Sequence, residues 1–198
     1  PIGRQNSSFY AGGLLRTEPE EIEQVASYEI GIQKYLYNPE LLPLFIGPPA
    51  RVEVDNLISM GIPLEKRDGQ YFPKSSAQSG PGGSIIMIPM VKKALDMGIT
   101  CLGNKIITDL LVSQSQVKGA LAMDEKGKFL RISAKAVILA TGGGANIFEH
   151  NSNPEGITGD GYVLALKAGA ILQNMEYIHF YPIGLVDSFF PHRRASPT

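Results

Sequence analysis

Apolar residues in the first half of the chain recur at intervals typical of amphipathic helices. The pattern predicts helices that begin at Thr17 and at Asn38, and others that cover Arg51–Met60 and Ser84–Met97. Thr17 and Glu20 form a capping box, which fixes the first of these helix starts. Gly61 and Gly98 follow the last two helices, as expected of glycines that end helices. Pro89 predicts a kink in the last helix.

Between two of these helices lies a polar stretch rich in glycine, proline and serine, KRDGQYFPKSSAQSGPGGS (66–84). Its composition predicts a turn followed by a long loop, with Ser84 as the cap of the helix behind it. Long loops in compact domains often carry function, so the stretch is a candidate for part of a binding site.

From residue 99 onward the pattern changes to short apolar runs that indicate β-strands. Strands are predicted over 105–112, 116–123, 128–133 and 136–140, and a last strand-like segment covers 174–185. A turn at Asp124–Gly127 joins the second strand to the third, and three strands on short connections form a β-meander. The run AVILA (136–140) is apolar enough to be buried on both faces. With a further helix beginning near Gly159–Gly161, the predicted fold class is mixed α/β.

Three consecutive glycines, Gly142–Gly144, follow AVILA directly and have two interpretations. The first is a plain glycine-rich turn after a core strand. The second is backbone that must approach a ligand closely. A dinucleotide fingerprint does not explain them, because Ile147 stands where its third glycine or alanine belongs. A P-loop is excluded because no glycine is followed by Lys-Ser/Thr at the required spacing.

Two other small-residue sites carry polar groups that suit a ligand. Asp160 stands between two glycines at the start of a predicted helix, where it is either an N-cap or an acceptor for a ligand hydroxyl. Ser7 and Ser8 precede the turn at Ala11–Gly13, which is either a plain turn or another ligand contact. One large flat ligand would account for all three sites together.

Composition and charge narrow the class of protein. The 198 residues carry a formal charge of −1, with 18 basic and 19 acidic residues, which gives no electrostatic basis for binding nucleic acid or an anionic membrane. No apolar run approaches the ~18 residues that would suggest insertion into a membrane. One cysteine, Cys101, and histidines without metal-ligand spacing predict no internal disulfide and no metal site. We therefore expect a cytoplasmic protein.

Four motifs, in their order along the chain, resemble the flavoprotein subunits of the succinate dehydrogenase/fumarate reductase family, which includes L-aspartate oxidase. The motifs are SSFYAGG, AKAVILATGG, TGDG and MEYIHFYPIGL, and the resemblance covers essentially the whole chain. It implies an FAD-dependent oxidoreductase that transfers hydride between the flavin and a small carboxylate-type substrate. The implied FAD contacts are Ser7, Ser8, Gly12, Gly13, Ala140, Thr141, Gly142 and Asp160. Tyr181 takes the position of the family's substrate-binding His, which implies a catalytic role for its neutral hydroxyl.

The resemblance also implies which part of the family's fold the chain represents. This part is a partial, doubly wound FAD-binding domain over 1–175, followed by the start of the capping, substrate-binding domain over 176–198. The family's first βαβ unit, with its G-x-G-x-x-G motif, would precede Pro1. Without that unit the isolated chain is expected to bind FAD weakly or not at all, and to be inactive. No His stands where members with covalent FAD carry one, so attachment would be non-covalent.

A non-catalytic interpretation stands beside this one. The chain would then be an α/β remnant without cofactor, which serves as a structural or partner-binding module. In both cases a missing first strand would leave the edge of a parallel sheet exposed. We therefore expect a homo-oligomer, or an assembly with further subunits.

Overall fold

The computed structural model describes residues 4, 6–11, 15, 40–41, 44, 48–67, 70–74 and 81–178. These residues divide into two compact units, and each is described by itself. The meander unit holds 6–7 and 101–178, and the helical unit holds the other described residues. The helix predicted from Thr17 lies outside the described residues, as does nearly all of the helix predicted from Asn38. Within the described part of the chain, no helix combines the length and the apolar character needed to cross a membrane.

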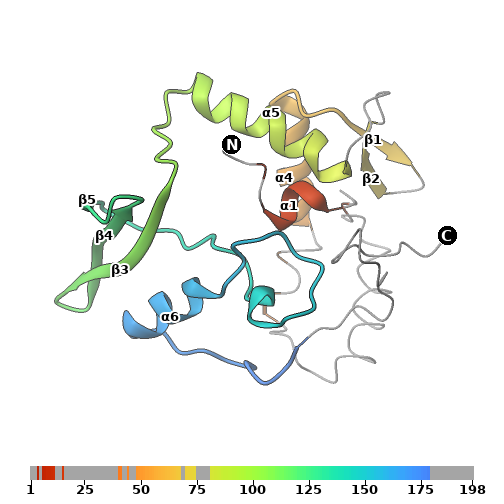
Figure 1. Ribbon diagram of the computed structural model, residues 1–198. Coiled ribbons are helices and arrows are strands. Elements are labelled where there is room, and N and C mark those ends of the chain that lie inside the picture. Colours follow the sequence, from red (N-terminus) through yellow and green to blue (C-terminus); the bar gives the residue numbers. More distant parts are fainter. Residues whose placement is uncertain are drawn as a thin grey trace. The chain divides into compact units, whose positions relative to one another are not determined.

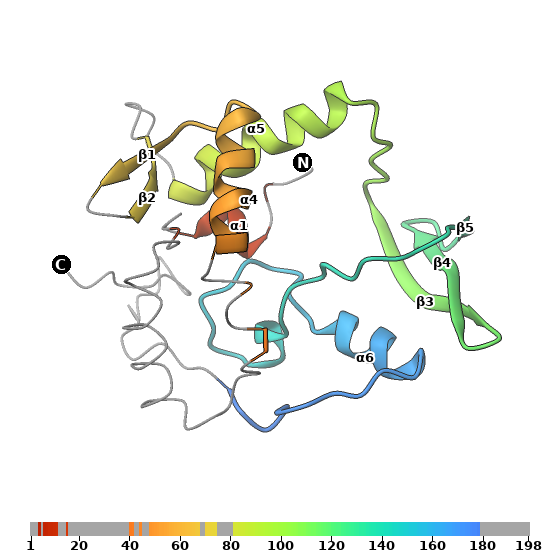
Figure 2. The same cartoon turned by 180° about the vertical axis from the view of Figure 1, so that it is seen from behind.

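Among the described residues, the helical unit contains two helices, part of a short third helix and a short hairpin (Figure 2). Its elements are α4 (Pro48–Ser59), β1 (Leu64–Arg67), β2 (Gln70–Pro73) and α5 (Gly82–Asp96), together with the part of α1 (Ser7–Tyr10) that follows Ser7. Its core consists of Val54, Ile62, Leu64 and Tyr71, with Leu15, Leu57 and Ile86 packed against it. The core thus joins α4, the hairpin and α5 through apolar burial.

The hairpin corrects the expectation of a turn and a loop over 66–84. β1 and β2 pair antiparallel, and each buries a single side chain, Leu64 and Tyr71 respectively. The Arg51 guanidinium carbon lies 4.8 Å from the centroid of the Tyr71 ring, which adds a cation–π contact to this burial. One buried residue in each four-residue strand gives too short an alternation to identify a strand from sequence.

Both helices of this unit begin earlier than predicted. α4 starts at Pro48 because proline is tolerated in the first turn, where its missing N–H is not needed. α5 has Pro81 as its N-cap, so Ser84 lies inside the helix and its hydroxyl donates to the Pro81 carbonyl at 2.6 Å. The predicted terminating glycines are confirmed, since Gly61 and Gly98 have φ angles of +84° and +76°.

The meander unit contains the predicted three-stranded meander (Figure 1). Its strands β3 (Lys105–Ser113), β4 (Gln116–Asp124) and β5 (Phe129–Ser133) pair antiparallel in chain order. The turn between β4 and β5 is confirmed, with Gly127 at φ +77° donating its N–H to the Asp124 carbonyl at 2.9 Å. The Asp124 carboxylate also accepts the backbone N–H groups of Lys126 and Lys128, both at 2.9 Å, which completes the turn.

The strand predicted over 136–140 does not form. Ile138 is 90% exposed, and this run pairs with no other described residue. A strand buried on both faces needs hydrogen-bonded neighbours, and composition alone does not supply them. The last predicted strand is also wrong as far as it is described, because 174–178 contains a turn, and the remainder lies outside the described residues.

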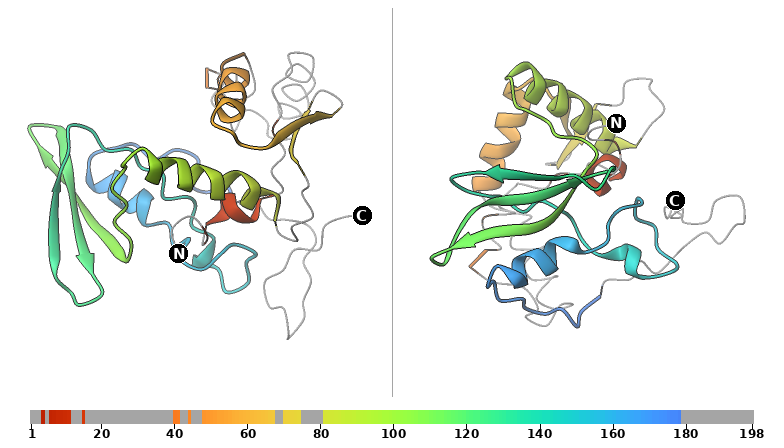
Figure 3. Two further views of the ribbon diagram at one scale, coloured as in Figure 1. Left: turned by 90° about the horizontal axis from the view of Figure 1, so that it is seen from above. Right: turned by 60° about the vertical axis from the view of Figure 1, so that its left-hand side comes forward.

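α6 (Asp160–Lys167) begins where the sequence predicts, after the 3-10 helix η1 (Ala145–Ile147). Leu164 is buried, and Lys167 Nζ lies 3.6 Å from Asp109 Oδ1 on β3. Figure 3 shows α6 running beside the meander within this unit. The ion pair is largely exposed and contributes little, so apolar burial holds the helix in place.

Gly119 in β4 is expected to tolerate no side chain. Its φ is +146°, and an added Cβ would lie 1.9 Å from the Ile132 carbonyl oxygen of β5. Gly119→Ala should therefore lower the free energy of unfolding by about 1–3 kcal/mol, measured by urea denaturation. The matched control is Gly103→Ala, whose Cβ would meet nothing within 4 Å, and which should change stability by less than about 0.5 kcal/mol. Equal stability of the two variants would contradict this close approach of β4 and β5.

Candidate functional site

The glycine loop, residues 141–144, packs closely against the start of α6. A Cβ on Gly161 would lie 1.9 Å from Thr141 Oγ1, and a Cβ on Gly144 would lie 3.3 Å from Gly159 Cα. The first distance excludes a side chain at Gly161, and the second leaves little space at Gly144. The structure therefore brings the ATGG and TGDG motifs together as one local structure.

The side chain of Ile157 packs against the glycine loop. Its side chain is buried, and a Cβ on Gly142 would lie 3.7 Å from its Cδ1 atom. Its carbonyl accepts the backbone N–H of Asn146 at 2.9 Å, which closes the segment between the loop and α6. Gly142 itself has a φ of +76°, a conformation that favours glycine. The fold of this segment thus explains the glycine at position 142.

The backbone N–H groups of residues 140–144 donate to no acceptor among the described residues. Ala140, Thr141 and Gly142 are exposed, and Gly143 and Gly144 are half-buried. Because the Thr141 side chain lies against Gly161, this part of the loop offers a ligand mainly backbone. Unpaired amides beside a helix N-terminus are suited to bind an anionic or acceptor-rich group.

Asp160 is the first residue of α6 and not its N-cap. The cap is Gly159, at φ +81°, and no side chain caps the helix. The Asp160 carboxylate instead accepts the Thr158 hydroxyl on Oδ2 at 2.7 Å, while Oδ1 has no hydrogen bond within the described residues. The side chain is exposed, so Oδ1 is available to a ligand. The structure therefore corrects the N-cap interpretation and leaves the ligand interpretation open.

Ser7 belongs to the same unit as the glycine loop. Its hydroxyl donates to Asn153 Oδ1 at 3.0 Å across 146 positions of sequence. Asn153 lies in an asparagine loop, residues 146–154, which further side-chain hydrogen bonds hold in shape. These bonds run from Asn153 N to Asn151 Oδ1 at 3.0 Å, from Asn151 Nδ2 to the Phe148 carbonyl at 3.0 Å, and from Asn146 Nδ2 to the Pro154 carbonyl at 3.1 Å.

Sequence reasoning missed these asparagines. The signal was the composition of NSNPEG, since Asn side chains bind nearby backbone groups in turns and Pro restricts the chain. That signal indicates an ordered turn, but it does not reveal that Asn153 contacts Ser7.

Ser8 belongs to the helical unit, where its backbone is packed tightly. A Cβ on Gly83 would lie 1.9 Å from the Ser8 carbonyl oxygen, and the Gly83 N–H donates to the Ala11 carbonyl at 2.7 Å. The start of α5 therefore supports the segment that follows Ser8, a role for Gly83 that the sequence did not predict. The Ser8 side chain is exposed. Gly12, Gly13 and Tyr181 lie outside the described residues, so their predicted roles stay predictions.

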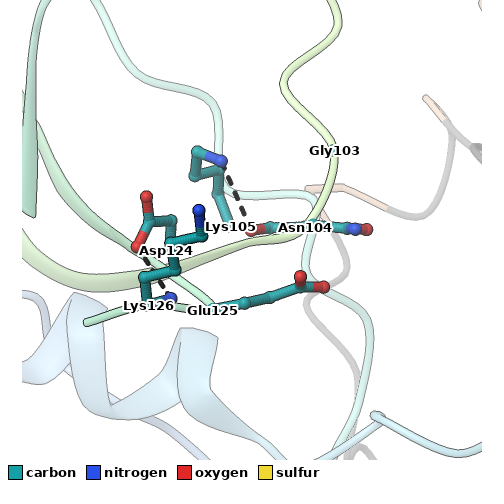
Figure 4. Close-up of a pocket in the computed structure, with 6 residues that line it drawn as sticks. All are labelled: Gly103, Asn104, Lys105, Asp124, Glu125 and Lys126. Carbon is teal, nitrogen blue, oxygen red and sulfur yellow. Dashed lines mark hydrogen bonds between the residues drawn. The ribbon is translucent and has the colours of Figure 1, made fainter. Parts of the chain in front are cut away.

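A separate hollow lies at the ends of β3 and β4 (Figure 4). It measures about 490 Å³ and is lined by Gly103, Asn104, Lys105, Asp124, Glu125 and Lys126. Its charges are mixed, its Asp124 carboxylate is used by the turn, and it contains none of the predicted site residues. Within the described residues, no three His, Cys, Asp or Glu side chains gather as metal ligands would.

The residues around the glycine loop fit a cofactor with a pyrophosphate and several hydroxyls. Unpaired amides suit phosphate oxygens, the open Asp160 oxygen suits a hydroxyl, and the absence of side chains permits close approach. FAD has these groups.

Comparison with known proteins agrees with this fit. Residues 33–196 match the family model described as FAD binding domain. L-Aspartate oxidase of Bacillus subtilis is 31% identical over 93% of this chain and 37% of its own length. The fumarate reductase flavoprotein subunit of Escherichia coli is 39% identical over 41% of this chain and 14% of its own length. A solved variant of the Escherichia coli quinol fumarate reductase superposes with a TM-score of 0.78 at 23% identity, covering 92% of this chain and 33% of the solved one.

These matches confirm the predicted fold class, a mixed α/β FAD-binding domain, and FAD as the cofactor of the family. The chain spans about 37% of the length of the L-aspartate oxidase that it matches. The chain belongs to the FAD-binding domain family, within the succinate dehydrogenase/fumarate reductase group of flavoproteins that its motifs resemble.

Proposed function

We propose that the chain supplies part of the FAD site of an FAD-dependent oxidoreductase. The observation that carries the proposal is the row of N–H groups over 140–144, beside the start of α6, that donate to no acceptor in the described part of the chain. Amides at a helix N-terminus bind anionic groups, and neighbouring glycines let a flat ligand approach the backbone. FAD, when bound, accepts or donates a hydride, and the residues of this chain bind and orient it.

The contacts follow the order of the motifs. Ser7, Ser8, Gly12 and Gly13 would lie along the pyrophosphate and isoalloxazine, while Ala140, Thr141 and Gly142 present backbone to the adenosine and ribityl part. Asp160 would accept a cofactor hydroxyl on the oxygen that Thr158 leaves open. Attachment would be non-covalent. We place the boundary between the FAD-binding and capping domains at 175/176, and we assign the protein to the cytoplasm.

The substrate is inferred to be a small carboxylate. The relatives include an L-aspartate oxidase and fumarate reductase flavoprotein subunits, whose names point to this class. Tyr181 would contact the substrate with a neutral hydroxyl.

We also propose that the protein associates, with itself or with further subunits, through the run 136–140. Its apolar side chains include Ile138, which is 90% exposed, and its backbone pairs with no described residue. An exposed apolar run with free backbone groups can form a strand by pairing with another strand.

Substitution of glycines in and beside the glycine loop is the main test of FAD binding. Gly143 has no positive φ, and an added Cβ would meet nothing within 4 Å, so the protein itself does not need a glycine there. If the cofactor approaches this backbone, Gly143→Ala should leave the unfolding midpoint unchanged and weaken FAD binding about tenfold. Gly161→Ala should reduce both stability and FAD binding, because its Cβ collides with Thr141. Flavin fluorescence titration and thermal unfolding measure the two effects.

Two controls sharpen this test. Gly103→Ala adds the same methyl group in open space outside the site and should change neither quantity. Thr141→Gly combined with Gly161→Ala removes the three atoms nearest to the new Cβ and should restore stability. Absence of FAD binding by the unmodified protein would contradict the proposed function and support a cofactor-free module. Unchanged FAD binding by Gly143→Ala would contradict close approach at the loop.

Tyr181→His should make the protein bind dicarboxylates more tightly. A protonated His adds a positive charge opposite the carboxylate, and its ordinary pKa of about 6.5 makes this gain larger at acidic than at alkaline pH. The expected result is a lower dissociation constant for dicarboxylates near pH 6 than near pH 8, measured by calorimetric titration, whereas the unmodified protein lacks this difference. The same dissociation constant for both proteins at both pH values would show that Tyr181 does not contact the carboxylate.

Self-association should depend on the apolar run 136–140. Light scattering is expected to find a dimer or larger assembly, and Ile138→Lys should shift it toward the monomer by placing a charge in the exposed run. Ile99→Lys is the matched control, because Ile99 is also exposed and lies outside that run. A monomer at all concentrations of unmodified protein would exclude the association.

A further inference from the structure

Ser7 and Asn153 form a side-chain hydrogen bond between distant parts of the sequence. The two half-buried residues lie 146 positions apart, with Ser7 Oγ 3.0 Å from Asn153 Oδ1. Ser7 belongs to the SSFYAGG motif, whereas Asn153 belongs to no motif of the proposed FAD site. The bond therefore ties one cofactor segment to a residue with no assigned role.

Asn153 is itself held in place relative to the glycine loop. Its N–H donates to Asn151 Oδ1 at 3.0 Å, and the carbonyl of the next residue, Pro154, accepts Asn146 Nδ2 at 3.1 Å. Asn146 also donates its N–H to the Ile157 carbonyl, and the Ile157 side chain packs beside Gly142. Hydrogen bonds, the Asn153–Pro154 peptide bond and the packing of Ile157 thus connect the glycine loop to the Ser7 hydroxyl.

The side-chain amide of Asn153 also determines whether the Ser7 hydroxyl proton is available to a ligand. A serine hydroxyl has one proton, and when Ser7 donates it to Asn153 none is left for a phosphate oxygen. An amide can instead donate from Nδ2 after exchanging the positions of its oxygen and nitrogen, since the two ends are nearly the same size. Ser7 Oγ would then accept from Asn153 and keep its proton for the cofactor. A carboxylate at position 153 could not make this exchange.

We propose that Asn153 is a positioning residue of the FAD site. It fixes the place of Ser7 relative to the glycine loop, and by turning its amide it leaves the Ser7 proton free to bind an FAD phosphate oxygen. This inference rests on the proposed function. Asn153 acts through Ser7 and does not need to touch the cofactor.

The test compares Asn153→Asp with Asn153→Ala, alone and together with Ser7→Ala. Asn153→Asp keeps an acceptor for Ser7, so the unfolding midpoint should stay unchanged while FAD binding weakens about tenfold, the size expected for losing one hydrogen bond to a charged group. Asn153→Ala should also weaken FAD binding, because Ser7 loses its support. In the Ser7→Ala background, both changes at position 153 should have little further effect on the FAD dissociation constant.

Asn104→Asp is the matched control for the added negative charge. Asn104 is exposed in the turn before β3 and should leave FAD binding unchanged. Unchanged FAD binding by Asn153→Asp would contradict the amide exchange. A loss of the same size in the Ser7→Ala background would show direct repulsion of phosphate and would also overturn the proposal. Failure of the unmodified protein to bind FAD would contradict the proposed function itself, and the inference with it.

Discussion

The close contact between the glycine loop and the start of α6 is the constraint on which the candidate site depends. Thr141 occupies the space that a side chain at Gly161 would need, and Gly144 lies against Gly159. The Thr141 side chain contacts the Gly161 backbone, and the Gly144 and Gly159 backbones contact each other, so these contacts fix the path of the loop beside α6. The same geometry leaves the N–H groups of 140–144 without acceptors among the described residues. These N–H groups are therefore available to a ligand.

Local signals predicted the parts of the fold that depend on neighbouring residues. Gly61, Gly98 and Gly127 occupy left-handed conformations at the predicted helix ends and at the meander turn. The run 136–140 shows the limit of such signals. Its composition is that of a buried strand, yet strand formation requires a partner, and no described residue pairs with it. The β1–β2 hairpin was not predicted for a different reason, because each of its strands buries only one side chain.

The candidate site also contains some residues that the sequence identifies as candidates and others that it does not. Glycines and Asp160 were candidates because their motifs place small residues beside polar groups at fixed positions in the sequence. Asn153 could not be found, since its contact with Ser7 spans 146 positions and nothing in NSNPEG identifies a distant serine as partner. Gly83 was missed likewise, because its need to be glycine arises from the Ser8 carbonyl and not from its own turn. Residues that support a site through distant contacts carry no local pattern.

The run 136–140, which pairs with no described residue, is followed directly by the glycine loop. Restricting the conformation of one segment therefore restricts the other. Burying a side chain such as Ile138 contributes about 1.5–3 kcal/mol, which a pairing strand would gain by covering this run. Such pairing would fix the direction from which the chain enters the loop at Thr141. A cofactor bound to the loop would restrict the same segment from its other end. Strand pairing and FAD binding should therefore favour each other, and by linkage each should strengthen the other by the same factor.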